Sequence, residues 1–191
     1  FLNRAYNPFN LVDLYQHAFD EISGENDSFP VQLINYPTEK KLNQIVLQAG
    51  ASESKKQWTP ESFSRIIQLI STHFPDYRIL LTGSGKEGEA LSAHFRNLPC
   101  ELLFGSTTVT ELISTVAQSR LLITNDTGTM HIAAAVKTPI IETSTGQVLF
   151  SETGPYSEGN LIIQAETDCI PCPFRLECPK QICKDEITPA E

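Results

Sequence analysis

The sequence predicts an α/β fold, a Rossmann-like parallel sheet with helices on both faces. From residue 45 onward, short stretches rich in Ile, Leu and Val alternate with longer amphipathic stretches. Continuous apolar strands are typical of parallel sheets that are covered on both faces, and the helices between them are the crossovers that parallel strands need. The chain has 191 residues, 40% hydrophobic and 19% charged, which suits one such domain with an appendage.

The expected strands are short apolar stretches, most of which end in Gly or a polar turn. They are residues 45–50, 77–83, 101–104, 120–124, 138–143 and, as a last strand, 160–164. The expected helices lie between them, at residues 59–74, 85–97 and 127–136 and after residue 108. Two helix starts carry local signals. Thr59 is an expected N-cap with Pro60 at the first helical position, and Thr108 with Glu111 forms an expected capping box.

We expect three segments. Residues 1–40 hold an amphipathic helix after Pro8 and an inter-domain linker, residues 41–167 form the strand–helix domain, and residues 168–191 form a Cys-rich tail. The chain does not begin with Met, and we expect it to be a fragment of a longer protein.

The chain is acidic, with 14 Lys and Arg against 23 Asp and Glu and a net charge of −9. Nucleic-acid affinity comes largely from Lys and Arg, so we expect no nucleic-acid partner; a small phosphate ligand can still be held by a helix N-terminus. No apolar run approaches the ~20 residues that cross a bilayer. Residues 1–20 show no secretory signal pattern, so we expect a cytoplasmic location.

Ligands of such sheets bind at the carboxyl ends of the strands, where the chain turns into the next helix. The turn after the fourth expected strand carries Asn125, Asp126, Thr127 and Gly128 and opens a helix at once. The glycine lets a ligand approach, and the first N–H groups of the helix suit a pyrophosphate. His131, four residues after Thr127, could donate to a phosphate oxygen. The alternative is that Asp126 or Thr127 only caps the helix and His131 packs.

Two further turns carry polar residues. After the first expected strand, Ser52 and Lys56 could bind phosphate; alternatively Lys55 and Lys56 are solvated and Trp58 is a hydrophobic staple. After the second strand, Glu87 could accept hydrogen bonds from a ribose, or it is an exposed acid in the first turn of a helix. The glycines around it form G-x-G-x-x-G, but this turn does not follow the first strand, so an NAD-type dehydrogenase is the weaker hypothesis.

Four cysteines gather near the end of the chain: Cys169, Cys172, Cys178 and Cys183. Their number suits a structural zinc or iron–sulfur site, and the first two form a C-x2-C pair. The alternatives are reduced thiols or disulfides. Cys100 stands alone, and we expect it to be part of the core.

Together, the turns match a known family pattern. The matching stretches are AGAS at 49–52, KQW at 56–58, G-x3-E at 83–87, NDTGTMHIAAA at 125–135 and the cysteine tail ending in CKDEI at 183–187. On these residues the sequence resembles the C-terminal domain of glycosyltransferase family 9, which includes the ADP-heptose:lipopolysaccharide heptosyltransferases. The resemblance covers roughly residues 40–188.

This resemblance implies the C-terminal half of a GT-B glycosyltransferase, whose two Rossmann-like domains face each other across a cleft. This half would hold the nucleotide-sugar donor, and the N-terminal half would hold a lipid-linked glycan acceptor at the inner face of the bacterial inner membrane. The family inverts the sugar and needs no metal for catalysis. Its general base lies in the N-terminal half, so this chain alone should bind donor but not transfer sugar.

The resemblance also assigns roles to residues. Ser52 and Lys56 would contact the donor phosphates, with Lys56 stabilising the leaving diphosphate, and Glu87 would bind the ribose or adenine side. Asp126 would bond the sugar hydroxyls, and the pyrophosphate would be held by Thr127, Gly128 and His131. The family's K-x-W-P is K-Q-W-T-P here, which could tilt the following helix. A different class of function stays open: a non-catalytic interaction module that a metal at the cysteines stabilises.

Overall fold

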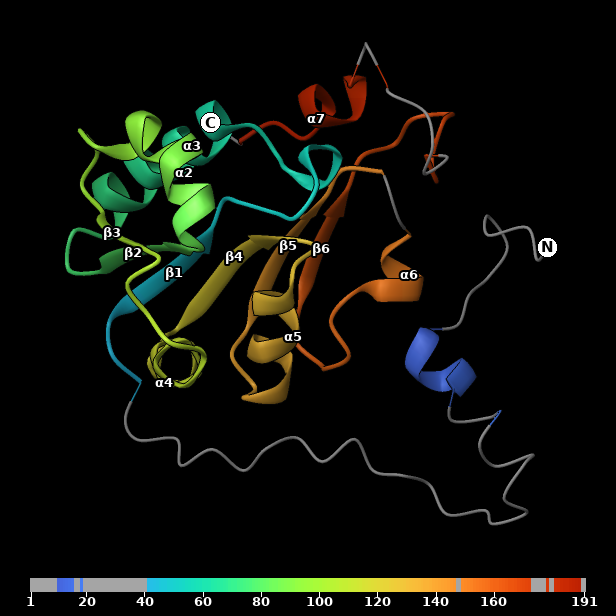
Figure 1. Ribbon diagram of the computed structural model, residues 1–191, viewed down its shortest axis with the longest axis horizontal. Coiled ribbons are helices and arrows are strands. Elements are labelled where there is room, and N and C mark those ends of the chain that lie inside the picture. The colour runs from blue at the N-terminus through green and yellow to red at the C-terminus, as the bar shows by residue number, and fades with distance from the viewer. Residues whose placement is uncertain are drawn as a thin grey trace.

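The computed structural model describes residues 10–15, 18, 41–146, 149–172, 178 and 181–189. Its centre is a six-stranded sheet in the order β3-β2-β1-β4-β5-β6 (Figure 1). Every neighbouring pair is parallel. This order is that of the doubly wound Rossmann fold, so the predicted fold class is confirmed. The strands are β1 (Gln44–Gln48), β2 (Arg78–Gly83), β3 (Glu101–Phe104), β4 (Leu121–Asn125), β5 (Ile140–Ser144) and β6 (Leu161–Gln164).

Helices cover both faces of the sheet (Figure 1). The side chains of α2 (Pro60–His73) and α3 (Gly85–Phe95) share one apolar cluster with alternate residues of β1 and β2. Those of α4 (Val109–Gln118) and α5 (Gly128–Ala135) share the second cluster, on the opposite face. The shorter helices are η2 (Ser54–Lys56), α6 (Phe150–Thr153) and α7 (Ile182–Glu186).

The predicted helix starts are confirmed. Thr59 caps α2, because its side-chain oxygen accepts a hydrogen bond from the Ser62 backbone N–H at 3.1 Å. Trp58 packs edge-on against Phe63 with 5.2 Å between ring centroids, which is the hydrophobic staple. The Thr108 capping box at α4 is also present.

The sequence of α4 predicts an apolar face formed by Val109, Leu112, Ile113 and Val116. Val109, the first residue of the helix, is 69% exposed, so this part of the prediction is wrong. The other three residues pack in the second cluster as predicted. The segment boundaries at residues 40 and 167 stay predictions, and most of residues 1–40 lie outside the described part of the chain.

Asn125, the last residue of β4, ties three parts of the fold together through its fully buried side chain. Its Oδ1 accepts hydrogen bonds from the Trp58 backbone N–H at 2.9 Å and from the Thr143 hydroxyl of β5 at 3.1 Å. Its Nδ2 donates to the Ala49 carbonyl, beyond β1, at 2.9 Å. One amide thus holds the turn after β1 against the carboxyl ends of β4 and β5.

We expect Asn125→Ala to lower the free energy of unfolding by about 3 kcal/mol, because it leaves buried N–H and C=O groups without partners. Urea unfolding followed by circular dichroism measures this change. The control is Asn43→Ala, since Asn43 is exposed and its side chain accepts only a 3.4 Å bond from Arg120 among the bonds described for it. Equal midpoints for the two variants would contradict the role given to Asn125.

Glu142 is a second polar residue inside the fold, on the central part of β5. Its side chain is 0% exposed, and neither carboxyl oxygen has a hydrogen-bond partner among the described residues. Burial is the main reason that the pKa of Glu142 rises to about 8. The group is therefore mostly protonated at neutral pH in the folded protein.

A raised carboxyl pKa makes stability fall as pH rises, because the unfolded chain releases a proton that the folded chain keeps. Between pH 4.5 and pH 7 this effect is about 3 kcal/mol for Glu142. We expect Glu142→Gln to lose that part of the pH dependence, measured as urea unfolding at both pH values. Glu101→Gln, at an exposed carboxylate paired with Arg78, should keep it. A wild-type protein and a Glu142→Gln variant with the same pH dependence would disprove this account.

Candidate functional site

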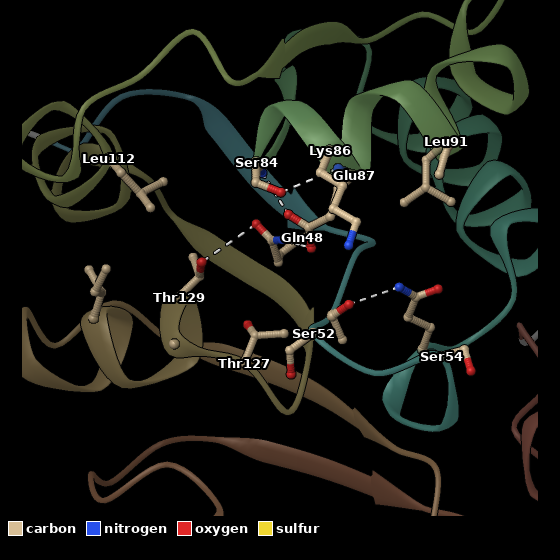
Figure 2. A pocket seen from close by; sticks show the side chains of 15 residues that line it. Gln48, Ser52, Ser54, Ser84, Lys86, Glu87, Leu91, Leu112, Thr127 and Thr129 are labelled. Carbon is tan, nitrogen blue, oxygen red and sulfur yellow. Dashed lines mark hydrogen bonds between the residues drawn. The ribbon is translucent and has the colours of Figure 1, made fainter. Parts of the chain in front are cut away.

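A cavity of about 670 Å³ lies at the carboxyl ends of the central strands, the place where doubly wound sheets bind ligands. Its walls come from β1 and the turn after it, from the N-terminus of α3 and from the start of α5 (Figure 2). This volume is in the range of sites for small molecules and cofactors. Four of the residues singled out in the sequence line it: Ser52, Glu87, Thr127 and Gly128.

The start of α5 forms one wall and has the features of an anion site. The N-cap, Thr127, is extended and makes no side-chain cap hydrogen bond; its hydroxyl lies 3.1 Å from the Thr124 hydroxyl instead. A Cβ built on Gly128 would meet no atom within 4 Å, so a ligand has room to approach the backbone there. The first N–H groups of α5 thus lack a side-chain cap and lie at the positive end of the helix dipole.

Lys56 and Asp126 form an ion pair beside this wall. The Lys56 Nζ lies 2.9 Å from the Asp126 Oδ2, and the two side chains are 21% and 8% exposed. The Thr153 hydroxyl of α6 donates to the same carboxylate oxygen at 3.4 Å. The pair joins η2 to the turn before α5, across 70 residues of sequence. The alternative in which Lys56 is simply solvated is therefore wrong.

Glu87 has two structural roles as well as its place in the cavity wall. Its Oε2 accepts a hydrogen bond from the Ser84 backbone N–H at 2.6 Å, while the Ser84 hydroxyl accepts from the Glu87 N–H at 3.2 Å. This capping box was missed in the sequence, although Ser84-x-x-Glu87 is its signature. A side chain at Gly50 would meet the Glu87 carboxylate, so a larger residue there would require Glu87 to shift.

Gln48 is a site residue that the sequence reading did not identify. It is only 5% exposed, and it sits at the end of β1 on the wall of the cavity. Its Oε1 accepts a hydrogen bond from the Thr82 hydroxyl at 3.0 Å. Its Nε2 donates to the Glu87 Oε1 at 3.3 Å, and both of these side chains are drawn in Figure 2. The signal was a glutamine at the end of an otherwise apolar strand. The resulting network fixes the orientation of the Glu87 carboxylate.

His131 does not join this group. It is exposed on α5, and the residues that line the cavity do not include it. Its predicted contact with a phosphate stays a prediction.

Glu142 is on β5, the strand beside β4, and the charges of the ion pair act on its carboxyl group. After burial, the negative charge of Asp126 raises the pKa of Glu142 further, and the positive charge of Lys56 lowers it. The carboxyl group is therefore within electrostatic reach of both members of the pair.

The four tail cysteines border a second, small cavity, together with Gly146 and Ile170. Cys169 and Cys183 are free thiols. Burial and the nearby Cys169 and Cys178 raise the pKa of the Cys183 thiol. Within the described residues, however, no three His, Cys, Asp or Glu side chains are arranged to hold a metal ion. The donor set suits a metal, whereas the arrangement described does not yet form its coordination shell. Cys100 packs against the core, as expected.

No helix in the described residues has the length and apolar character needed to span a bilayer.

Comparison with known proteins identifies a family for this chain. A family model described as glycosyltransferase family 9 (heptosyltransferase) matches residues 11–182. Among curated proteins, lipooligosaccharide heptosyltransferase 2 of Campylobacter jejuni is 29% identical over 141 residues, which are 70% of this chain and 43% of that protein. The chain thus spans less than half the length of this relative.

Solved structures share the fold. Escherichia coli heptosyltransferase WaaC with ADP has a TM-score of 0.65 at 21% identity, and the match covers 81% of this chain and 50% of that one. TibC from enterotoxigenic Escherichia coli, described as an iron-containing dodecameric glycosyltransferase, has a TM-score of 0.58 at 15% identity, covering 81% and 44%. The likeness of fold agrees with the family match, which extends over most of the 191 residues. The chain belongs to glycosyltransferase family 9, the heptosyltransferase family.

Proposed function

We propose that this chain is the donor-binding part of an inverting glycosyltransferase that moves heptose from an ADP-sugar to a lipopolysaccharide-type acceptor. The observation that carries the proposal is the cavity between the turn after β1 and the start of α5, with Lys56 beside it. A helix N-terminus without a side-chain cap and an ammonium group together suit a diphosphate. The name of WaaC records ADP in a protein of this fold.

Each predicted residue has a role in this proposal. Lys56 and the N–H groups at Gly128 neutralise the charge that develops on the departing diphosphate. Ser52 and Thr127, which both line the cavity, bind its oxygens. Glu87, held in place by Ser84 and Gln48, accepts hydrogen bonds from the ribose or the adenine.

Asp126 bonds the hydroxyl groups of the donor sugar and holds Lys56 in place until the donor arrives. His131 would approach the pyrophosphate once the donor is bound. Catalysis in this proposal needs no metal ion. In this proposal the general base and the site for the lipid-linked acceptor belong to the N-terminal half of the enzyme, and the reaction takes place at the cytoplasmic face of the inner membrane.

We expect ADP to bind the 191-residue chain with a Kd between about 10 µM and 1 mM, as suits half of a cleft. Lys56→Ala should weaken ADP binding at least tenfold, because an ammonium–phosphate contact is worth more than about 1.4 kcal/mol. Asp126→Ala should also weaken binding, because Lys56 loses the partner that holds it near the cavity. Isothermal titration calorimetry with ADP, UDP, GDP and NAD measures these affinities.

The matched control is Lys55→Ala, which removes the same charge one residue away, at a position that borders the small cavity of the tail cysteines. An unchanged affinity in Lys56→Ala would contradict the proposed role of this lysine. A chain that binds none of the nucleotides, yet contains stoichiometric metal, would instead be the metal-stabilised interaction module. Saturation by NAD alone would favour a dehydrogenase domain.

We also propose that the tail cysteines hold a structural metal ion, zinc or iron. The four thiols border one small cavity, and the charges of Cys169 and Cys178 act on Cys183. The description of TibC as iron-containing shows that a protein of this fold can carry a metal. Forming the site requires the tail to close around the ion.

Metal analysis of protein purified without chelator should find about one zinc or iron per chain. Cys172→Ser should lose the metal and lower the thermal unfolding temperature, while Cys100→Ser should keep it, since Cys100 packs in the core. Purified protein with no metal and four reactive thiols would refute this second proposal and leave the donor site untouched.

A further inference from the structure

Near the proposed donor site is a buried carboxyl group, that of Glu142, to which the proposed function gives no role. Glu142 is 0% exposed in the sheet, in register with Thr124 of β4. Neither of its carboxyl oxygens has a hydrogen-bond partner among the described residues, and neither has the buried hydroxyl of Ser144, two residues further along the same strand. Buried polar groups without partners are rare, and each calls for an explanation.

The charged groups that act on Glu142 are those of the ion pair, Asp126 and Lys56. The other elements around β5 contribute little charge. The strand on its far side, β6, carries no titratable side chain, α5 carries only the exposed His131, and α6 carries the buried Glu152. Glu142 therefore faces one ammonium group and one carboxylate that belong to the proposed donor site.

Donor binding creates a difficulty for this pair. If Lys56 turns toward a diphosphate, its contact with Asp126 weakens, and Asp126, which is 8% exposed, keeps the Thr153 hydroxyl at 3.4 Å. Weakening the partner of a buried charge is unfavourable, because the charge is poorly solvated. A hydrogen-bond donor close to Asp126 would offset this cost.

We propose that Glu142 is a positioning residue for the donor site: its neutral carboxyl group donates a hydrogen bond to Asp126 when Lys56 turns toward the donor diphosphate. A carboxylic acid that donates to a carboxylate forms one of the stronger hydrogen bonds in proteins. The proton stays on the pair, so no net charge is added to the buried site. This inference rests on the proposed function, since it requires a diphosphate ligand for Lys56.

The inference sets the sign of a pH dependence. Burial, followed by the charge of Asp126, raises the pKa of Glu142 to about 8, so the donating form predominates at pH 7. At pH 9 the group is ionised and cannot donate to Asp126, so Lys56 stays with Asp126. If only the neutral form permits binding, the Kd for ADP at pH 9 is about ten times that at pH 7.

The test is calorimetric titration of ADP into the 191-residue chain at pH 7 and at pH 9, with circular dichroism to confirm folding at both. The wild-type Kd should rise about tenfold. Glu142→Gln cannot ionise but can still donate an N–H, so its Kd should be the same at both pH values. Glu101→Gln removes an exposed carboxylate elsewhere on the sheet and should show the wild-type rise. The second ionisation of a phosphate, near pH 6, is complete before this range and is common to all variants.

A wild-type Kd that stays constant, or one that rises equally in Glu142→Gln, would overturn the role of Glu142 and leave the proposed donor site standing. Absence of ADP binding at pH 7 in every variant would overturn the proposed function, and this inference with it.

Discussion

The geometry of the site depends on one buried amide, that of Asn125. Its carbonyl oxygen and its NH2 group bind backbone groups on both sides of the turn after β1 and a hydroxyl of β5. Because these partners come from segments far apart in the sequence, the amide fixes where Lys56 stands relative to the N-terminus of α5. The strands form a rigid sheet, and the Asn125 side chain fixes the distance between the turns at the carboxyl ends of these strands.

Beside the cavity, the ammonium group of Lys56 forms an ion pair with the buried carboxylate of Asp126. The charges of both groups act on a second buried carboxyl group, that of Glu142. A chain with net charge −9 offers a diphosphate little attraction over its surface. The attraction must therefore come from a few groups at the site: the dipole and N–H groups of α5, Lys86 on the cavity wall, and Lys56 beside the cavity.

Most of the fold could be predicted from the sequence because its signals are local. Apolar stretches gave the strands to within a few residues, and Thr59 and Thr108 gave two helix starts. The Lys56–Asp126 pair could not be predicted, because its members are 70 residues apart and meet only through the strand order. The burial of Glu142 could not be predicted for the same reason: its surroundings come from turns elsewhere in the chain, and its own strand mixes apolar and polar residues.

Gly50 shows how closely the turn after β1 approaches the N-terminus of α3. Any side chain at this position would displace the carboxylate of Glu87, which caps α3 and bonds Gln48 of β1. Glycine at this position therefore leaves room for the carboxylate that caps α3 and forms part of the cavity wall. A larger residue at Gly50 would move that carboxylate, and its effect on ligand binding would come through Glu87.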